Sequence, residues 1–97
     1  MRILLIEDET ALRETLTDRL NQEGFAVDAC GDGVEGAYFA TEYPIDLAIV
    51  DLGLPGQSGM DVVRALRRAK KKYPVLILTA RDHWQDKVEA LEMGADD

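Results

Sequence analysis

The chain has 97 residues, with 11 Lys and Arg against 19 Asp and Glu, so its formal net charge is −8. This length suits one small domain with a buried core, and the apolar runs are far shorter than the roughly 18 residues that span a bilayer, so no membrane segment is expected. The single cysteine rules out a disulfide framework and favours a reducing, cytoplasmic location, while the surplus of acidic residues disfavours direct binding of nucleic acid by this segment.

The first third of the chain predicts two strands that flank a helix. Arg2–Ile6 is a short apolar run typical of a strand, and Thr10–Glu23 is predicted to be an amphipathic helix because its leucines recur at four-residue spacing. Gly24 is suited to end this helix in a left-handed conformation. Phe25–Cys30 has the alternating pattern of a strand at the edge of a sheet, partly open to water.

The middle of the chain repeats this order. Asp32 is a candidate N-cap for a helix that runs to about Tyr43, where a proline follows. Asp46–Asp51 predicts a third strand, which is apolar on both faces and is therefore expected to be central. Ser58 is a candidate N-cap for a third helix that runs from Gly59 to about Lys71.

The remaining residues complete four strand-and-helix units. Val75–Thr79 predicts a fourth strand, also apolar on both faces, and Trp84–Met93 predicts a fourth helix. Apolar strands that alternate with helices are typical of an α/β fold. In this fold a parallel sheet is covered by helices on both faces, and the crossovers are right-handed.

Candidate functional residues lie where the strands end. In open parallel sheets, ligands bind beyond the carboxyl ends of the strands. Glu7 and Asp8 follow the first strand, Asp51 ends the third, and Thr79 ends the fourth. Because parallel strands place these ends at one edge, the four side chains are expected to converge. Glu9 is instead expected to face the positive N-terminus of the next helix.

Three carboxylates that converge in this way repel one another, which should raise at least one pKa, and a bound divalent cation would remove the repulsion. Oxygen ligands favour a hard ion over zinc, and the small number of protein ligands favours Mg²⁺ over Ca²⁺, because it leaves room for water molecules and a phosphoryl oxygen. With a metal present, Asp51 could act as a nucleophile and form an aspartyl-phosphate, while Thr79 and a backbone amide of the next loop could hold a phosphoryl oxygen. In the alternative interpretation each acidic residue is a solvated cap, but the joint pattern disfavours it.

Four short motifs are distributed over the whole chain: Ile6–Glu9, Val50–Pro55, Leu78–Arg81 and Gly94–Asp97. Together they resemble the receiver domain of two-component response regulators, and the second and third resemble its OmpR/PhoB subfamily. The resemblance implies a flavodoxin-like, three-layer fold with strand order 2-1-3-4-5. Residues 1–97 are then expected to form an incomplete receiver domain, with strand order 2-1-3-4, that ends before the fifth strand and helix.

The resemblance also implies roles for the residues at the sheet edge. Asp51 would accept a phosphoryl group from a histidine kinase. Asp8 and Asp51 would ligate Mg²⁺ directly, Glu7 would do so through water, and Gly53 through its backbone carbonyl. The domain would therefore be a regulatory phosphoacceptor and not an enzyme.

Residues near the end of the chain receive roles from the same resemblance. Thr79 would be the switch hydroxyl and, with Ala80, would contact the phosphoryl group. Lys87, Asp96 and Asp97 correspond to charged positions in the dimer face of the family. Phosphorylation would control dimerisation and the output of an attached winged-helix DNA-binding domain, which lies outside this chain.

The sequence also predicts self-association through the fourth strand and leaves two competing functions open. Val75–Leu78 lacks the neighbour that the family's fifth strand supplies, so the chain is expected to self-associate through this edge or through the fourth-helix face. One competing function is a receiver-like interaction scaffold that takes no phosphate. The other is a Mg²⁺-dependent aspartyl phosphatase. It is disfavoured because Gly53 stands two residues after Asp51, where a second carboxylate could serve as general acid.

Overall fold

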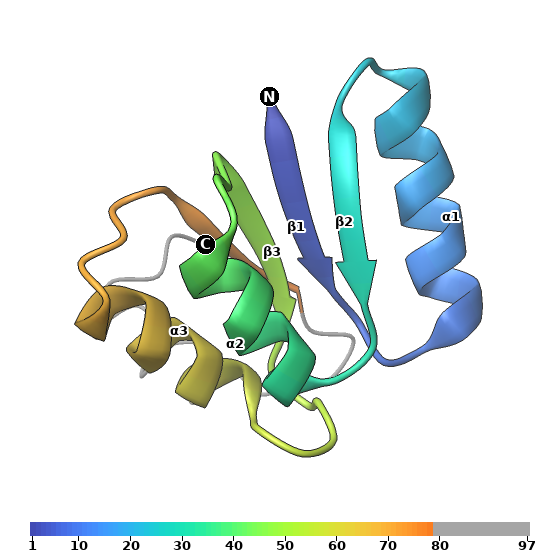
Figure 1. Ribbon diagram of the computed structural model, residues 1–97. Helices are drawn as coiled ribbons and strands as arrows, with labels where there is room; N and C mark the ends of the chain where they lie inside the picture. Colours follow the sequence, from blue (N-terminus) through green and yellow to red (C-terminus); the bar gives the residue numbers. More distant parts are fainter. Residues whose placement is uncertain (79–97) are drawn as a thin grey trace.

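The structure, a computed structural model, describes residues 1–78. Its four strands are parallel and lie in the order β2-β1-β3-β4 (Figure 1), which confirms the predicted α/β class and strand order. The predicted helix at Trp84–Met93 lies outside the described residues. The elements are β1 Arg2–Ile6, α1 Thr10–Gln22, β2 Ala26–Cys30, α2 Gly33–Glu42, β3 Leu47–Asp51, α3 Gly59–Arg68 and β4 Val75–Leu78.

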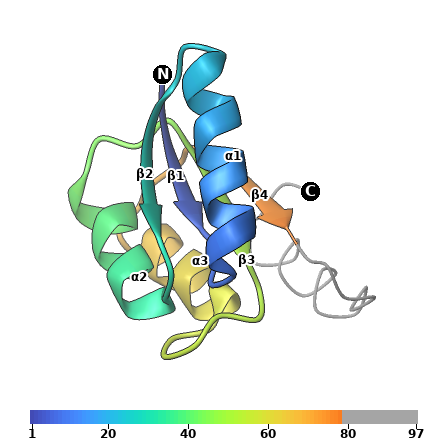
Figure 2. The ribbon, with the colours of Figure 1, turned by 90° about the vertical axis from the view of Figure 1, so that its right-hand side faces the viewer.

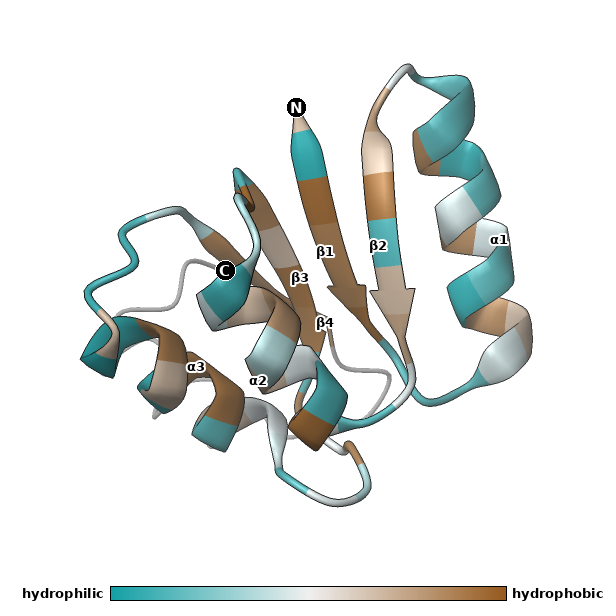
Figure 3. Cartoon of the chain, in the orientation of Figure 1, coloured by the Kyte–Doolittle hydropathy of each residue, from teal (hydrophilic) through white to brown (hydrophobic). Residues whose placement is uncertain are grey.

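Helices cover both faces of the sheet, as predicted. Helix α1 lies on one face, and α2 and α3 lie beside each other on the other face (Figures 1 and 2). Strands β1 and β3 are hydrophobic along most of their length (Figure 3). Within residues 1–78, no helix is both long and apolar enough to cross a bilayer. The main core lies between the sheet and the α2–α3 layer, and its fully buried members are Leu4, Ile6, Ala40, Ala48, Val50, Val62, Val63, Leu66 and Val75.

Side-chain caps begin two of the helices. The Asp32 carboxylate accepts a hydrogen bond from the Glu35 N–H at 2.7 Å, and the Ser58 hydroxyl accepts one from the Asp61 N–H at 3.2 Å. Gly24 has a φ of 93°, the left-handed conformation expected after α1. All three predicted helix signals are therefore confirmed.

The third helix ends at Arg68, three residues before the approximate end predicted at Lys71. Lys70 adopts a left-handed conformation with a φ of 63° and donates its N–H to the Arg67 carbonyl at 2.9 Å. The Lys71 N–H donates to the Leu66 carbonyl, also at 2.9 Å. This pair of bonds is a Schellman motif, which usually requires glycine or asparagine and is therefore hard to recognise at a lysine.

The positions of the strands match the expected order on both sides of the sheet. Strand β3 is central, between β1 and β4, and β2 lies at the edge, as predicted. Strand β4 ends the strand order among residues 1–78, as the expected order 2-1-3-4 implies, although its sequence is apolar on both faces. Val75 and Ile77 are buried in the α2–α3 layer, whereas Leu76, on the opposite face, is 41% exposed.

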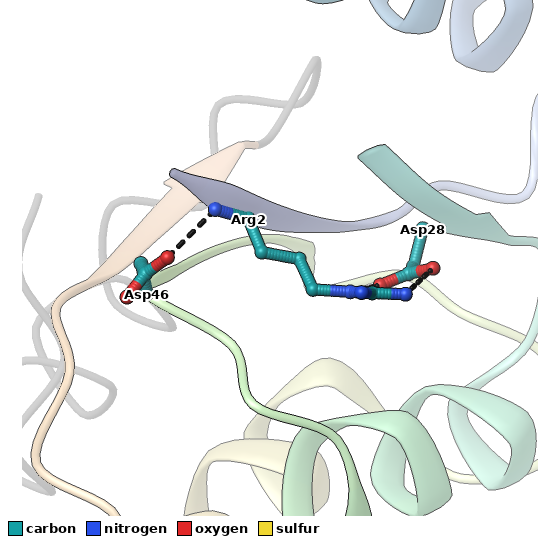
Figure 4. Close-up of polar contacts among 3 residues, drawn as sticks. All are labelled: Arg2, Asp28 and Asp46. Carbon is teal, nitrogen blue, oxygen red and sulfur yellow. Dashed lines mark hydrogen bonds and ion pairs between the residues drawn. The ribbon is translucent and has the colours of Figure 1, made fainter. Parts of the chain in front are cut away.

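A group of polar contacts joins three segments near the amino ends of the strands (Figure 4). The Arg2 guanidinium donates to both carboxylate oxygens of Asp28 on β2, at 2.5 and 3.0 Å, and this hydrogen-bonded pair raises the pKa of Arg2. The Arg2 backbone N–H donates to the Asp46 carboxylate at 2.7 Å, and the guanidinium carbon lies 5.7 Å from the centre of the Tyr43 ring. We call Arg2, Asp28, Asp46 and Tyr43 the amino-end cluster.

Candidate functional site

Three acidic side chains meet at the carboxyl ends of β1 and β3. The strand register pairs Ile6 with Val50, so the residues that follow them, Glu7 and Asp51, are neighbours across the sheet. Carboxylate oxygens of Glu7, Asp8 and Asp51 lie within 4.8 Å of one another. The convergence predicted from parallel topology therefore occurs for these residues, which we call the acidic triad. Metal binding by the triad stays a prediction.

Backbone contacts hold Glu7 in a buried position. Its residue surface is only 4% exposed, and its N–H donates to the Cys30 carbonyl at 3.0 Å. The Glu9 N–H donates to the Glu7 carboxylate at 3.1 Å, so this bond spans the residue between them, Asp8. Asp8 itself is exposed and Asp51 is half-buried. The triad therefore has a buried side and a side that is open to solvent.

Burial raises the pKa of the Glu7 carboxyl from 4.5 to about 7. The hydrogen bond from the Glu9 N–H opposes this rise, while the neighbouring Asp51 and Asp8 carboxyls add to it. A raised pKa was expected from mutual repulsion of the carboxylates, but desolvation is the larger cause. The ionised form of Glu7 is therefore disfavoured unless a cation or a proton compensates it.

The loop after β3 holds Asp51 through its backbone. The Gly53 N–H donates to the Asp51 Oδ1 atom at 3.2 Å, which orients the carboxylate. A Cβ atom at Gly59 would lie 2.3 Å from the Asp51 carbonyl oxygen, so only glycine fits at the start of α3 without a shift of the backbone. The positive φ in this loop is at Gly56, at 76°. A ligand role for the Gly53 carbonyl stays a prediction.

The donor set of the triad fits Mg²⁺. Three carboxylates from two strand ends supply the hard oxygen ligands that this ion prefers, and the exposed side leaves room for the water molecules that it retains. The disfavoured ionisation of Glu7 is a second sign of the fit, because a divalent cation would stabilise the charged form.

Five of the predicted site residues lie outside the described part of the chain. They comprise the proposed phosphoryl contacts and the proposed dimer face, and their roles stay predictions: Thr79, Ala80, Lys87, Asp96 and Asp97.

Sequence reasoning missed Arg13, on α1. Its Nη1 atom donates to the carbonyl oxygen of Glu7, a member of the acidic triad, at 2.8 Å. One signal was available. A cation close to the N-terminus of a helix is disfavoured by the helix dipole, so its presence there indicates another partner.

The site and the fold together define a class of protein. The response regulator receiver domain family matches residues 3–97, so the chain belongs to this family. Among solved structures, the response regulator TrrA of Thermotoga maritima in complex with Mg²⁺ and BeF is 34% identical with a TM-score of 0.86, over 98% of this chain and 81% of that one. A Burkholderia pseudomallei response regulator with a phosphorylated aspartic acid, a calcium ion and citrate is 27% identical with a TM-score of 0.89, over 98% and 56%.

Sequence comparison with characterised relatives indicates a particular group within this family. The two-component response regulator PhoP of Pseudomonas aeruginosa is 55% identical over all 97 residues, and this match covers 43% of that protein. The chain therefore spans less than half the length of the relatives it matches. The likeness agrees with the segment Trp84–Glu89, whose sequence resembles that of PhoP proteins.

Proposed function

We propose that this receiver domain accepts a phosphoryl group on Asp51 from a sensor histidine kinase, in the presence of Mg²⁺. The observation that carries the proposal is the convergence of the three carboxylates within 4.8 Å, around a buried Glu7 whose pKa is about 7. Membership of the receiver family and the likeness to structures with Mg²⁺–BeF or a phosphorylated aspartic acid support it.

Asp8 and Asp51 would hold Mg²⁺ directly, Glu7 through water and Gly53 through its carbonyl oxygen. When bound, the ion would neutralise the carboxylates and the incoming phosphoryl oxygens. The protein contributes orientation, because the Gly53 N–H engages one oxygen of the Asp51 carboxylate at 3.2 Å. The other oxygen stays available for attack.

The transfer step is a displacement at phosphorus. A carboxylate oxygen of Asp51 forms a bond to the phosphorus of the kinase phosphohistidine, and the phosphorus–nitrogen bond breaks. The electron pair of that bond stays on the imidazole nitrogen, and because the other ring nitrogen carries a proton, the kinase histidine leaves as a neutral imidazole. The Thr79 hydroxyl and the Ala80 backbone amide would bind a phosphoryl oxygen of the product.

Phosphorylation would act as a regulatory switch and not as catalysis of substrate turnover. In the proposed pathway the phosphorylated domain, located in the cytoplasm, pairs with a second copy through a face that includes Lys87, Asp96 and Asp97. The output is DNA binding by a winged-helix effector domain in the same protein. The likeness to PhoP regulators, which are more than twice as long as this chain, supports this output.

The 97-residue chain would also self-associate through the edge of β4 or the fourth-helix face. Within residues 1–78, β4 ends the sheet, and its Leu76 side chain is 41% exposed. An unpaired strand edge is a template for pairing with another chain. Light scattering at high protein concentration tests this, and a strictly monomeric mass would contradict it.

Mass spectrometry after incubation with acetyl phosphate and Mg²⁺ tests the phosphoacceptor role. We expect the mass of one phosphoryl group on Asp51, and we expect Asp51→Asn or removal of Mg²⁺ to abolish it. Asp8→Asn and Glu9→Gln form a matched pair, because both remove one exposed carboxylate from the same loop. Only the first should reduce phosphorylation. If the wild-type chain takes up no phosphoryl group and does not bind Mg²⁺, the result would favour the alternative function, a receiver-like interaction scaffold.

A further inference from the structure

Arg13 contacts the acidic loop on both sides of Asp8. Its guanidinium Nη1 atom donates to the Glu7 carbonyl oxygen at 2.8 Å, in a partly buried bond. Its backbone N–H donates to the Glu9 carbonyl oxygen at 2.9 Å. The second bond is the first main-chain hydrogen bond of α1, for which Glu9 is the N-cap, so the guanidinium bond is the one that joins α1 to the loop before Asp8.

The peptide group between Glu7 and Asp8 depends on the first of these bonds. A peptide unit is planar, so the direction of the Glu7 carbonyl also sets where the Asp8 Cα atom lies. On the other side of Glu7, the N–H donates to the Cys30 carbonyl at 3.0 Å. Glu7 is thus held by β2 through its N–H and by α1 through its carbonyl.

We propose that Arg13 is a positioning residue for the acidic triad. By fixing the Glu7–Asp8 peptide, its guanidinium holds the Glu7 and Asp8 carboxylates in the arrangement that takes Mg²⁺ together with Asp51. The role rests on the metal-dependent function proposed above and adds to it a residue that touches neither the metal nor the phosphoryl group.

The sign of the effect separates positioning from simple electrostatics. Arg13 is a cation close to an acidic site, so its removal makes the site more negative. By Coulomb's law alone this change would strengthen the binding of Mg²⁺. A positioning role predicts the opposite, because a carbonyl that loses its donor lets the loop shift and moves two ligands out of place.

Titration of the 97-residue chain with Mg²⁺, followed by calorimetry or NMR shifts, tests the proposal. We expect R13M to weaken Mg²⁺ binding about tenfold, the range found when groups that orient metal ligands are removed. R13K keeps a charged donor and should recover most of the affinity. R19M is the matched control, because Arg19 lies on the same helix but is 73% exposed and pairs with Glu23 at 3.6 Å.

Amide hydrogen exchange without metal gives a second readout. In R13M the amide of Glu9, which donates to the Glu7 carboxylate, and that of Arg13, in the first turn of α1, should exchange about tenfold faster, which reflects local opening. Amides of α3 should exchange at the wild-type rate, which also reports that the variant is folded. If R13M does not fold, R13Q, whose side chain is too short to reach the carbonyl, replaces it with the same expected results.

Unchanged or tighter Mg²⁺ binding by R13M, with wild-type exchange at the loop amides, would overturn the role of Arg13. A wild-type chain that binds no Mg²⁺ would instead count against the proposed function. Equal weakening in R13M and R19M would also overturn the positioning role, because it would trace the effect to helix α1 or to net charge.

Discussion

The two ends of the sheet treat their carboxylates in opposite ways. In the amino-end cluster, Asp28 and Asp46 accept hydrogen bonds from the guanidinium and the backbone N–H of Arg2 (Figure 4). In the acidic triad, the groups of residues 1–78 that act on the pKa of Glu7 are other carboxyls and a backbone N–H, and no Lys or Arg is among them. A carboxylate therefore has a guanidinium partner at one end, whereas at the other end the carboxylates of Glu7 and Asp51 have backbone N–H partners and lie close enough to repel one another.

This difference indicates which end is structural and which is functional. A buried carboxylate without a cation lowers stability, and such arrangements are typical of sites that bind a ligand or react. Changes in the amino-end cluster should therefore alter stability alone. Changes in the acidic triad should alter stability and Mg²⁺ affinity together, in opposite directions.

The largest expected effect is a pH dependence at Glu7. The folded-state pKa of Glu7, about 7, lies above its ordinary value of 4.5. The protonated Glu7 carboxyl therefore contributes fully to the free energy of unfolding below pH 4.5, and this contribution is lost as the pH rises to 7. In metal-free protein, the free energy of unfolding of Glu7→Gln should therefore rise by about 3 kcal/mol relative to that of wild type when the pH is raised from 4 to 8. Urea unfolding at both pH values measures it.

Glu9→Gln is the control for this experiment, since it removes an exposed carboxylate from the same loop. It should change stability similarly at both pH values. Mg²⁺ should diminish the loss in wild type at pH 8, because a cation favours the ionised triad. A pH dependence that is equal in wild type and Glu7→Gln would contradict the burial of Glu7 as its source.

The next effect tests the amino-end cluster. Asp28→Ala removes the partner of the Arg2 guanidinium from a side chain that is 17% exposed, and we expect it to lower the free energy of unfolding by about 1 kcal/mol. Mg²⁺ affinity should stay at the wild-type value. Weaker Mg²⁺ binding in this variant would break the division between the two ends.

A smaller effect of opposite sign is expected at Asp51. In metal-free protein at pH 8, Asp51→Asn relieves repulsion in the acidic triad and should raise the free energy of unfolding by about 0.5 kcal/mol. Mg²⁺ should stabilise wild type but not this variant. A lower free energy of unfolding for Asp51→Asn would contradict this prediction. It would mean that the favourable contacts of the half-buried Asp51 carboxylate outweigh its repulsion of Glu7 and Asp8.

The smallest effect sets the baseline for a charge removed from the surface. Arg19 pairs with Glu23 at 3.6 Å, and both side chains are largely exposed. R19M should change the free energy of unfolding by less than about 0.5 kcal/mol, as expected for an exposed ion pair. A larger loss in thermal or urea unfolding would show that α1 depends on this pair.

Much of the fold could be predicted because it depends on local signals and on periodicity. Asp32 and Ser58 cap helices as their side chains suggest, and the alternation of strands and helices implies a parallel sheet. The same topology predicts that residues after β1 and β3 meet, which brings Glu7 and Asp51 together.

Features that depend on side-chain reach or on unusual backbone could not be predicted. The Arg2–Asp28 pair joins residues 26 positions apart, and no local pattern indicates it. Lys70 ends α3 in a conformation that its residue type disfavours. Arg13 reaches the Glu7 carbonyl because α1 starts directly after the acidic loop. A search for acidic metal ligands does not find a basic residue of this kind.

The hydrogen bond between the Cys30 carbonyl and the Glu7 N–H makes the sole thiol of the chain a chemical probe of motion at the acidic triad. Cys30 is 3% exposed, and burial raises the pKa of its thiol to about 12, so it should resist alkylation in the closed structure. Its carbonyl accepts the Glu7 N–H, so opening that exposes the thiol disturbs the acidic loop as well. The rate at which Cys30 is labelled would therefore report the opening of the end at which we propose that Mg²⁺ binds, and Mg²⁺ should slow the labelling.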